Sequence, residues 1–125
     1  MGAVESLRNS VLNKILNATD FATQATHLSL HTADPGTTGA SEVAGGSYAR
    51  QAITFAAAAA GVSASNVVCT FAVMPACTVT HVGLWTAVSA GTYLWRGVMT
   101  VSKALDAGDT LEFASGAITV PTTGA

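Results

Sequence analysis

The first region of the chain has an apolar pattern with helical spacing. Its apolar residues recur mostly at intervals of three or four positions: Val4, Leu7, Val11, Leu12, Ile15 and Leu16. This spacing gathers apolar side chains on one side of a helix, with polar residues on the other. The pattern stops at Asn17, where Asn-Ala-Thr-Asp brings side chains that compete for backbone hydrogen bonds. We therefore predict one short amphipathic helix that ends at about Asn17.

Further along the chain the apolar period changes to two, which is typical of strands. Leu28 and Leu30 alternate with His27, Ser29 and His31. The same kind of pattern predicts strands over these ranges: 27–32, 48–55, 66–74, 77–87, 92–101, 109–114 and 117–121. The alanine-rich segment 56–66 is predicted to be a short connection, because a run of five alanines is too brief to hold a helix without packing.

Short turn signals such as Met-Pro-Ala and Asp-Ala-Gly-Asp separate the predicted strands. Connections this short leave no room for the crossover helices that a parallel sheet needs. The sequence therefore predicts a mainly β protein, an antiparallel two-sheet β-sandwich of jelly-roll-like type preceded by one N-terminal helix. Residues 1–20 would form the helix, packed on the sandwich or on a neighbour, and residues 21–125 the sandwich, within a single domain.

The composition adds to this picture that few residues of the chain are charged. Of 125 residues, 50% are hydrophobic and only 10% are charged, against about a quarter in ordinary globular proteins. A solitary soluble protein usually covers itself with charged side chains, so this composition predicts that other molecules cover much of the surface. The net charge is -2, and the five Lys and Arg residues are scattered, which argues against nucleic acid as a partner. We also expect no membrane association, because no apolar run is long enough to cross a bilayer.

The longest predicted loop runs from Thr32 to Tyr48. It begins with Asp34-Pro35-Gly36, in which proline, glycine and a capping aspartate combine to stop a strand. The rest of the loop has too few apolar residues to form a core of its own, so it must be pinned from outside or remain mobile. Arg50 is predicted to hold Glu42, to hold an acidic group of another subunit, or to be a solvated strand residue.

We predict that this loop region contacts other subunits. The candidate interface residues are His31, Asp34, Glu42, Tyr48 and Arg50. The N-terminal helix and the C-terminal tail "PTTGA" are also expected to touch neighbours.

The candidate catalytic and metal-binding residues favour simpler roles. His27 and His31 share a strand face, but their spacing of roughly 13 Å is too long for one metal ion, so we interpret them as a solvated or interface-facing strand side. His81 is predicted to be hydrogen-bonded and partly buried. The serines lack a strand-to-helix elbow such as G-x-S-x-G. We therefore predict no catalytic residue, no metal and no cofactor.

The two cysteines, Cys69 and Cys77, have no base close in sequence that would activate a thiolate. We predict that they are small buried apolar residues. A disulfide is the alternative if the two lie on adjacent antiparallel strands.

Several short sequence motifs resemble those of a known group of proteins. These are "LSLHTADPG", "EVAGGSYARQAITF", "VTHVGLW" and "AGDTLEF". They resemble a family of small structural proteins of tailed bacteriophages, labelled tail-fibre, minor tail or head-decoration proteins. The resemblance extends from Leu7 to about Ile118. It implies a virion structural protein, a β-sandwich after a short helix that assembles as copies on the particle, and it does not imply an enzyme.

Our leading hypothesis from the sequence is a capsid decoration (cement) protein, a homotrimer that binds the major capsid protein at the virion surface after synthesis in the host cytoplasm. The alternative is a tail-associated or tail-fibre protein that binds a receptor, with Trp85, Tyr93 and Trp95 stacked on host sugars. These aromatic residues fall in strands, on one alternation face, so we interpret them mainly as core. A small hydrolase has only three unplaced histidines in its favour.

Overall fold

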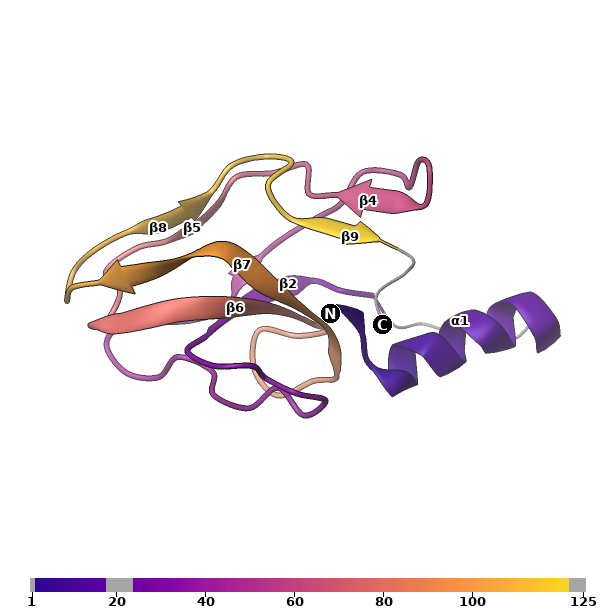
Figure 1. Cartoon of the computed structure of the whole chain (residues 1–125), viewed down its shortest axis with the longest axis horizontal. Coiled ribbons are helices and arrows are strands. Elements are labelled where there is room, and N and C mark those ends of the chain that lie inside the picture. Colours follow the sequence, from indigo (N-terminus) through magenta and orange to yellow (C-terminus); the bar gives the residue numbers. More distant parts are fainter. Residues whose placement is uncertain (1, 18–23, 122–125) are drawn as a thin grey trace.

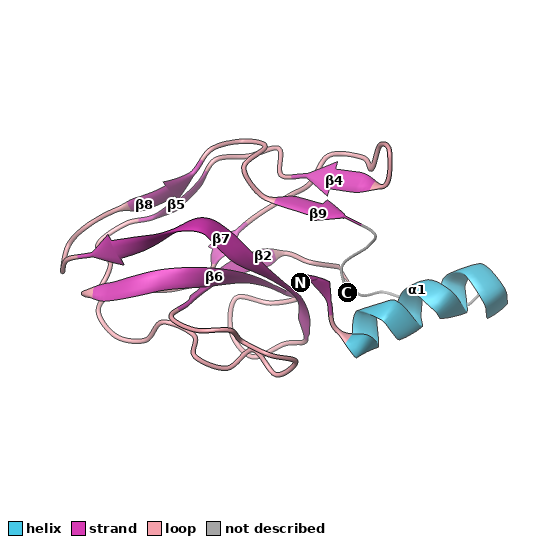
Figure 2. Cartoon of the chain, in the orientation of Figure 1, coloured by secondary structure: helices cyan, strands magenta, loops and turns pink. Residues whose placement is uncertain are grey.

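A computed structural model describes residues 2–17 and 24–121 of the chain, and its architecture is mainly β with one short N-terminal helix (Figure 2). The elements are β1 (Gly2–Ala3), α1 (Glu5–Asn17), β2 (His27–His31), β3 (Gln51–Ala52), β4 (Val62–Ala64), β5 (Cys69–Phe71), β6 (Cys77–Trp85), β7 (Tyr93–Leu105), β8 (Leu111–Phe113) and β9 (Thr119–Pro121). Every strand pair in the described part of the chain is antiparallel, as predicted.

The strands form one larger sheet and two small ones. The five-stranded sheet has the order β1-β7-β6-β2-β3, and the two-stranded sheets are β4-β9 and β5-β8. Figure 1 shows both small sheets above β6 and β7. The hydrogen bonding therefore divides the described strands into three sheets, where the sequence pattern predicted two.

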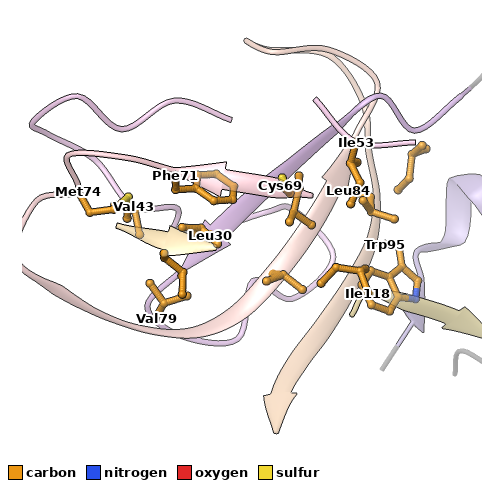
Figure 3. Close-up of a cluster of buried hydrophobic side chains, with 14 residues drawn as sticks. Leu30, Val43, Ile53, Cys69, Phe71, Met74, Val79, Leu84, Trp95 and Ile118 are labelled. Carbon is orange, nitrogen blue, oxygen red and sulfur yellow. The ribbon is translucent and has the colours of Figure 1, made fainter. Parts of the chain in front are cut away.

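The main core lies between the five-stranded sheet and the two small sheets. Leu28 and Leu30 of β2 are fully buried there, in one cluster with Phe71 of β5 and Leu111 of β8. Figure 3 shows Leu30, Phe71 and Ile118 in this cluster. The alternation of β2 predicts this face, because residues two apart point to the same side of a sheet.

The opposite face of the five-stranded sheet is covered as well. Trp85 and Tyr93 form a second buried cluster with Val4, and the loop between β2 and β3 contacts this face near Gly39. Both faces of β2 are thus covered, and the run Leu28–His31 is buried at every position. The loop takes the place of a second layer on this side.

Helix α1 extends away from the sheets (Figure 1). The chain enters it through a hydrogen bond from Val4 N to Leu94 O of 2.9 Å, and Leu7 packs against the main core. Its later apolar residues are exposed, to 42% at Val11, 52% at Leu12, 71% at Ile15 and 72% at Leu16. The predicted helix and its end at Asn17 are confirmed.

Several predicted strand limits are wrong. Of the predicted strand 48–55, only Gln51–Ala52 pairs with β2, and Phe55 forms one isolated bridge with Ser65. The predicted connection 56–66 contains β4, which pairs with β9. β7 continues past the predicted end at residue 101 to Leu105 because it follows β6 along its whole length.

Candidate functional site

Glu42 and Arg50 form a two-pronged ion pair between the long loop and the residue next to β3. Arg50 Nε donates to Glu42 Oε2 at 2.9 Å, and Arg50 Nη2 donates to Glu42 Oε1 at 2.9 Å. The side chains are only 9% and 22% exposed. Of the three roles predicted for Arg50, pairing with Glu42 is confirmed, and the solvated strand residue is wrong because the loop folds over the guanidinium.

The same guanidinium reaches β6 and the turn that follows it. Arg50 Cζ lies 3.6 Å from the centroid of the Trp85 ring, a distance at which the ring face attracts a cation. Arg50 Nη1 also donates to Ala87 O at 3.2 Å and to Ala90 O at 2.8 Å. One side chain therefore ties the loop, β6 and the β6–β7 turn together.

Tyr48 adds a third connection to this group. Its hydroxyl donates to Glu42 Oε2 at 2.8 Å and accepts from Leu30 N at 3.0 Å, so the loop also bonds to the edge of β2. Burial raises the pKa of Tyr48 well above its ordinary value, which keeps the hydroxyl protonated. Burial also acts to raise the pKa of Glu42, but hydrogen bonds from Arg50 and Tyr48 outweigh it, and the pKa is lowered.

His31 lies beneath the loop and is fully buried. Its Nδ1 is 2.8 Å from Ala40 O, which only accepts, so Nδ1 carries the proton. Nε2 then accepts from Ser29 Oγ at 2.7 Å, and Ser29 Oγ accepts from Trp85 Nε1 at 2.8 Å. Burial lowers the pKa of His31. The prediction of a solvated side is therefore wrong for His31, because the loop covers this face of β2.

Asp34 lies apart from this cluster. Its Oδ1 accepts from Gly36 N at 2.9 Å, which confirms the predicted turn, and it also accepts from Arg96 Nη1 at 3.1 Å. The side chain is 57% exposed. The Gly36 hydrogen bond is the main reason that the pKa of Asp34 is lowered.

Two glycines that the sequence prediction did not single out make room for the cluster. A Cβ at Gly39 would lie 2.5 Å from Trp85 Cζ2, and one at Gly83 would lie 2.7 Å from Ser29 Oγ. Gly39 also has a φ of +77°, which favours glycine. A glycine inside a strand often marks a close approach, and that signal points to Gly83 in "VTHVGLW".

The cluster of His31, Glu42, Tyr48, Arg50 and Trp85 is called the loop clamp below. Every charged or polar contact described above for it is made within the chain, so it fastens the loop to the sheet. Contact with other subunits through the predicted interface residues stays a prediction.

Other sequence predictions also have clear outcomes. His81 is partly buried, with Nδ1 2.8 Å from Thr80 Oγ1, as predicted.

Cys69 and Cys77 are free thiols, so the disulfide alternative is wrong: β5 pairs with β8 and not with β6. Trp85, Tyr93 and Trp95 are 8%, 6% and 6% exposed, which confirms their interpretation as core.

None of the described helices is both long and apolar enough to span a bilayer.

A family model described as podophage GP4 fiber I protein gp80 matches residues 2–121. The chain belongs to this family. It is a structural protein of a bacteriophage virion, as the sequence resemblance implied. No curated protein matches the chain.

Proposed function

We propose that this protein is a structural subunit of a podophage fibre. The observation that carries the proposal is the family match, which extends over residues 2–121 and so includes every described strand and helix. The family description names a fibre protein, and it favours the tail-fibre alternative over capsid decoration. Binding to the major capsid protein stays a prediction.

The layered arrangement of the protein supports a structural role. Small sheets cover one face of the five-stranded sheet, and the loop fixed by the clamp covers the other. We interpret this layering as a β-sandwich body, residues 21–125, that carries a helical arm, residues 1–20. A jelly-roll order of strands stays a prediction.

A receptor-binding role through the three aromatic residues has no support. Arg50 lies over the Trp85 ring and Gly39 contacts its edge, so no open aromatic platform for a sugar exists there. Tyr93 and Trp95 are equally buried. The proposed fibre subunit therefore contributes structure and assembly, and any host contact would use other residues.

Association with other copies is part of the proposal, in the form of a homotrimer. The low fraction of charged residues supports it, as does the exposed apolar side of α1. Among the predicted interface residues, Asp34 is the most accessible to a neighbour. Residues 122–125 of the tail, which were also predicted to touch neighbours, lie outside the described residues.

Labelling of virions tests the proposal. An epitope tag would be added to the C-terminus of this protein in the phage genome, and gold-labelled antibody would locate it by electron microscopy. The control is the same tag on the major capsid protein. We expect label on fibres at the tail end of the particle. Label distributed over the head, as in the control, would contradict the fibre role and support capsid decoration.

A further inference from the structure

His31 joins the long loop to the five-stranded sheet through a chain of hydrogen bonds. Its Nδ1 donates to Ala40 O in the loop at 2.8 Å, and its Nε2 lies 2.7 Å from Ser29 Oγ. Ser29 Oγ also accepts from Trp85 Nε1 at 2.8 Å. A hydroxyl has one proton to donate, so Ser29 donates it to Nε2, and Nε2 itself carries none. The closed loop therefore holds His31 as a neutral imidazole.

A second proton on this ring would break the chain of hydrogen bonds. Nε2 would become a donor to Ser29 Oγ, which already accepts from Trp85, and the hydroxyl proton of Ser29 would lose its acceptor. Ser29 and His31 are both fully buried, so bulk water neither replaces the lost partner nor solvates the new charge. Burial of an ion or of an unpaired donor costs free energy. The closed loop therefore disfavours the imidazolium form.

The charged groups on the loop side do not offset this cost. Burial is the main reason that the pKa of His31 is lowered, and the Arg50 guanidinium adds to it. The hydrogen bond to Ala40 O and the charge of Glu42 act in the opposite direction but are outweighed. The Glu42 carboxylate is already bonded to Arg50 at 2.9 Å and to the Tyr48 hydroxyl at 2.8 Å. It is therefore committed to partners other than His31.

The titratable groups on the sheet side do not stabilise a charged ring either. His81 of β6 is paired directly with His31 of β2, and a positive charge on His81 further lowers the pKa of His31. The centroid of the Tyr93 ring of β7 lies 6.3 Å from that of His31. Burial raises the pKa of Tyr93 above its ordinary value, so its hydroxyl stays neutral. Neither group therefore favours an imidazolium at position 31.

The loop can separate from the sheet while the strands stay paired. Of its residues Thr32–Tyr48, all of which are described, only Val43 is among the buried residues of the main core. Strand β2 is held independently, because each of its residues pairs with β6. Loops with few buried apolar contacts open at a lower free energy than core strands. Release of the loop therefore leaves the pairing of β2 with β6 intact.

We propose that His31 is a pH-sensitive switch, which keeps the loop closed over Trp85 while its ring is neutral and releases the loop when the ring takes up a proton. The sheets stay folded in both states. Opening lets water reach the imidazolium and uncovers the side of Trp85 and Tyr93 that Gly39 of the loop contacts. This conformational change goes beyond the fibre role and does not depend on it.

Proton linkage gives the direction and the size of the response. In the open loop His31 has the ordinary pKa of 6.5, and in the closed loop its pKa is lower. The closed state is therefore favoured most strongly above pH 6.5 and loses stability as the pH falls toward the closed-state pKa. From about pH 7.5 to about pH 5 the ratio of open to closed loops should rise by up to about 30-fold. Glu42, whose ordinary pKa is 4.5, adds to the opening only at lower pH.

Hydrogen exchange of the full chain at about pH 7.5 and about pH 5 tests the proposal, after correction for the intrinsic pH dependence of exchange. The amides of Thr32 and Val43 bond to Ser41 O and Leu30 O when the loop is closed. Their corrected exchange should be faster at the lower pH, by up to about 30-fold, and that of amides within β6 and β7 should not change. Loop exchange that is independent of pH, or strands that open together with the loop, would overturn the proposal.

Two histidine variants assign the response to one ring. Gln does not titrate in this pH range, so the loop of His31→Gln should lose most of the pH dependence of its exchange. The matched control is His27→Gln on the same strand, where the native ring bonds to Thr26 Oγ1; this variant should keep the wild-type response. An undiminished response in His31→Gln, or a lost one in His27→Gln, would assign the switch to another group and refute the inference.

NMR of the wild-type chain gives a second test, which does not require that His31→Gln folds. Trp85 Nε1 bonds to Ser29 Oγ, whereas Trp95 Nε1 has no partner among the described residues. The indole proton signal of Trp85 should shift with the same midpoint as the His31 ring, and that of Trp95 should not. A Trp85 signal that stays constant throughout the His31 titration would show that the ring and the loop are not coupled.

Discussion

The guanidinium of Arg50 lies over the ring of Trp85, with Cζ 3.6 Å from the ring centroid, although 35 positions separate the two residues in the sequence. The contact closes the loop clamp, because the same guanidinium also holds Glu42.

Arg50→Lys should lower the free energy of unfolding by about 2–3 kcal/mol, because a lysine cannot reproduce the two-pronged pair or the bonds to Ala87 and Ala90. Urea denaturation followed by tryptophan fluorescence measures the change. The control is Arg96→Lys, whose pair with the exposed Asp34 should contribute less than about 1 kcal/mol. Equal losses in the two variants would contradict the clamp.

The loop clamp should also make stability depend on pH through Glu42. The pKa of Glu42 is lowered in the folded state from its ordinary value of 4.5, so the unfolded chain binds a proton first as the pH falls. The free energy of unfolding should therefore be highest above pH 4.5 and decrease as the pH falls through the folded pKa. Glu42→Gln should be less stable at neutral pH and should show a smaller decrease below pH 4.5.

His31 predicts a second pH effect at higher pH. Burial lowers its pKa below the ordinary value of 6.5, so protonation of the unfolded chain should reduce stability as the pH falls below 6.5. Proton NMR of the imidazole rings should show a midpoint for His31 below 6.5. A midpoint at or above 6.5 would mean that the ring is not enclosed by the loop.

Gly83→Ala tests the close packing under the loop. The new Cβ would lie 2.7 Å from Ser29 Oγ and 2.9 Å from Tyr93 Cε1, so these side chains must shift. We expect a loss of about 1–3 kcal/mol in the free energy of unfolding, measured by thermal or urea denaturation. Ala104→Ser, at an exposed position of β7, serves as the control and should be close to neutral. Unchanged stability of Gly83→Ala would show that this space is open.

The thiols should differ in reactivity. Cys69 is buried, and burial raises the pKa of its thiol to about 11, whereas Cys77 is partly exposed. A maleimide added to the native protein at pH 7 should therefore label Cys77 first and Cys69 only after unfolding, because the thiolate is the nucleophile. Peptide mass spectrometry identifies the labelled residue. Prior labelling of Cys69 in the native protein would contradict the packing of β5.

Patterns along the chain predicted the individual helix and strands better than the elements that pack or pair with them. The spacing from Val4 to Leu16 was enough to place α1, because helical periodicity is a local property. The direction in which α1 extends from the sheets was not predictable, because an apolar helix face indicates only that another surface covers it. β4 was missed because Val62–Ala64 lies among alanine, glycine and serine, and its pairing with β9 is a long-range event.

In the candidate site, too, local features were predictable from the sequence, whereas contacts between distant residues were not. Turn chemistry identified Asp34, and charge complementarity in sequence gave Glu42 as one of the possible partners of Arg50. The burial of His31 was not predictable from β2 alone, because the residues that cover it belong to the loop. Trp85 was identified as core, but its place between Gly39 and Arg50 depends on how that loop folds back.

The loop clamp has a consequence for natural variation. It holds the loop through Glu42, Tyr48 and Arg50, while Thr37 and Thr38 at the outer part of the loop are exposed. Substitutions at these outer positions leave the fastening intact, so this surface can change in sequence without rebuilding the scaffold beneath it.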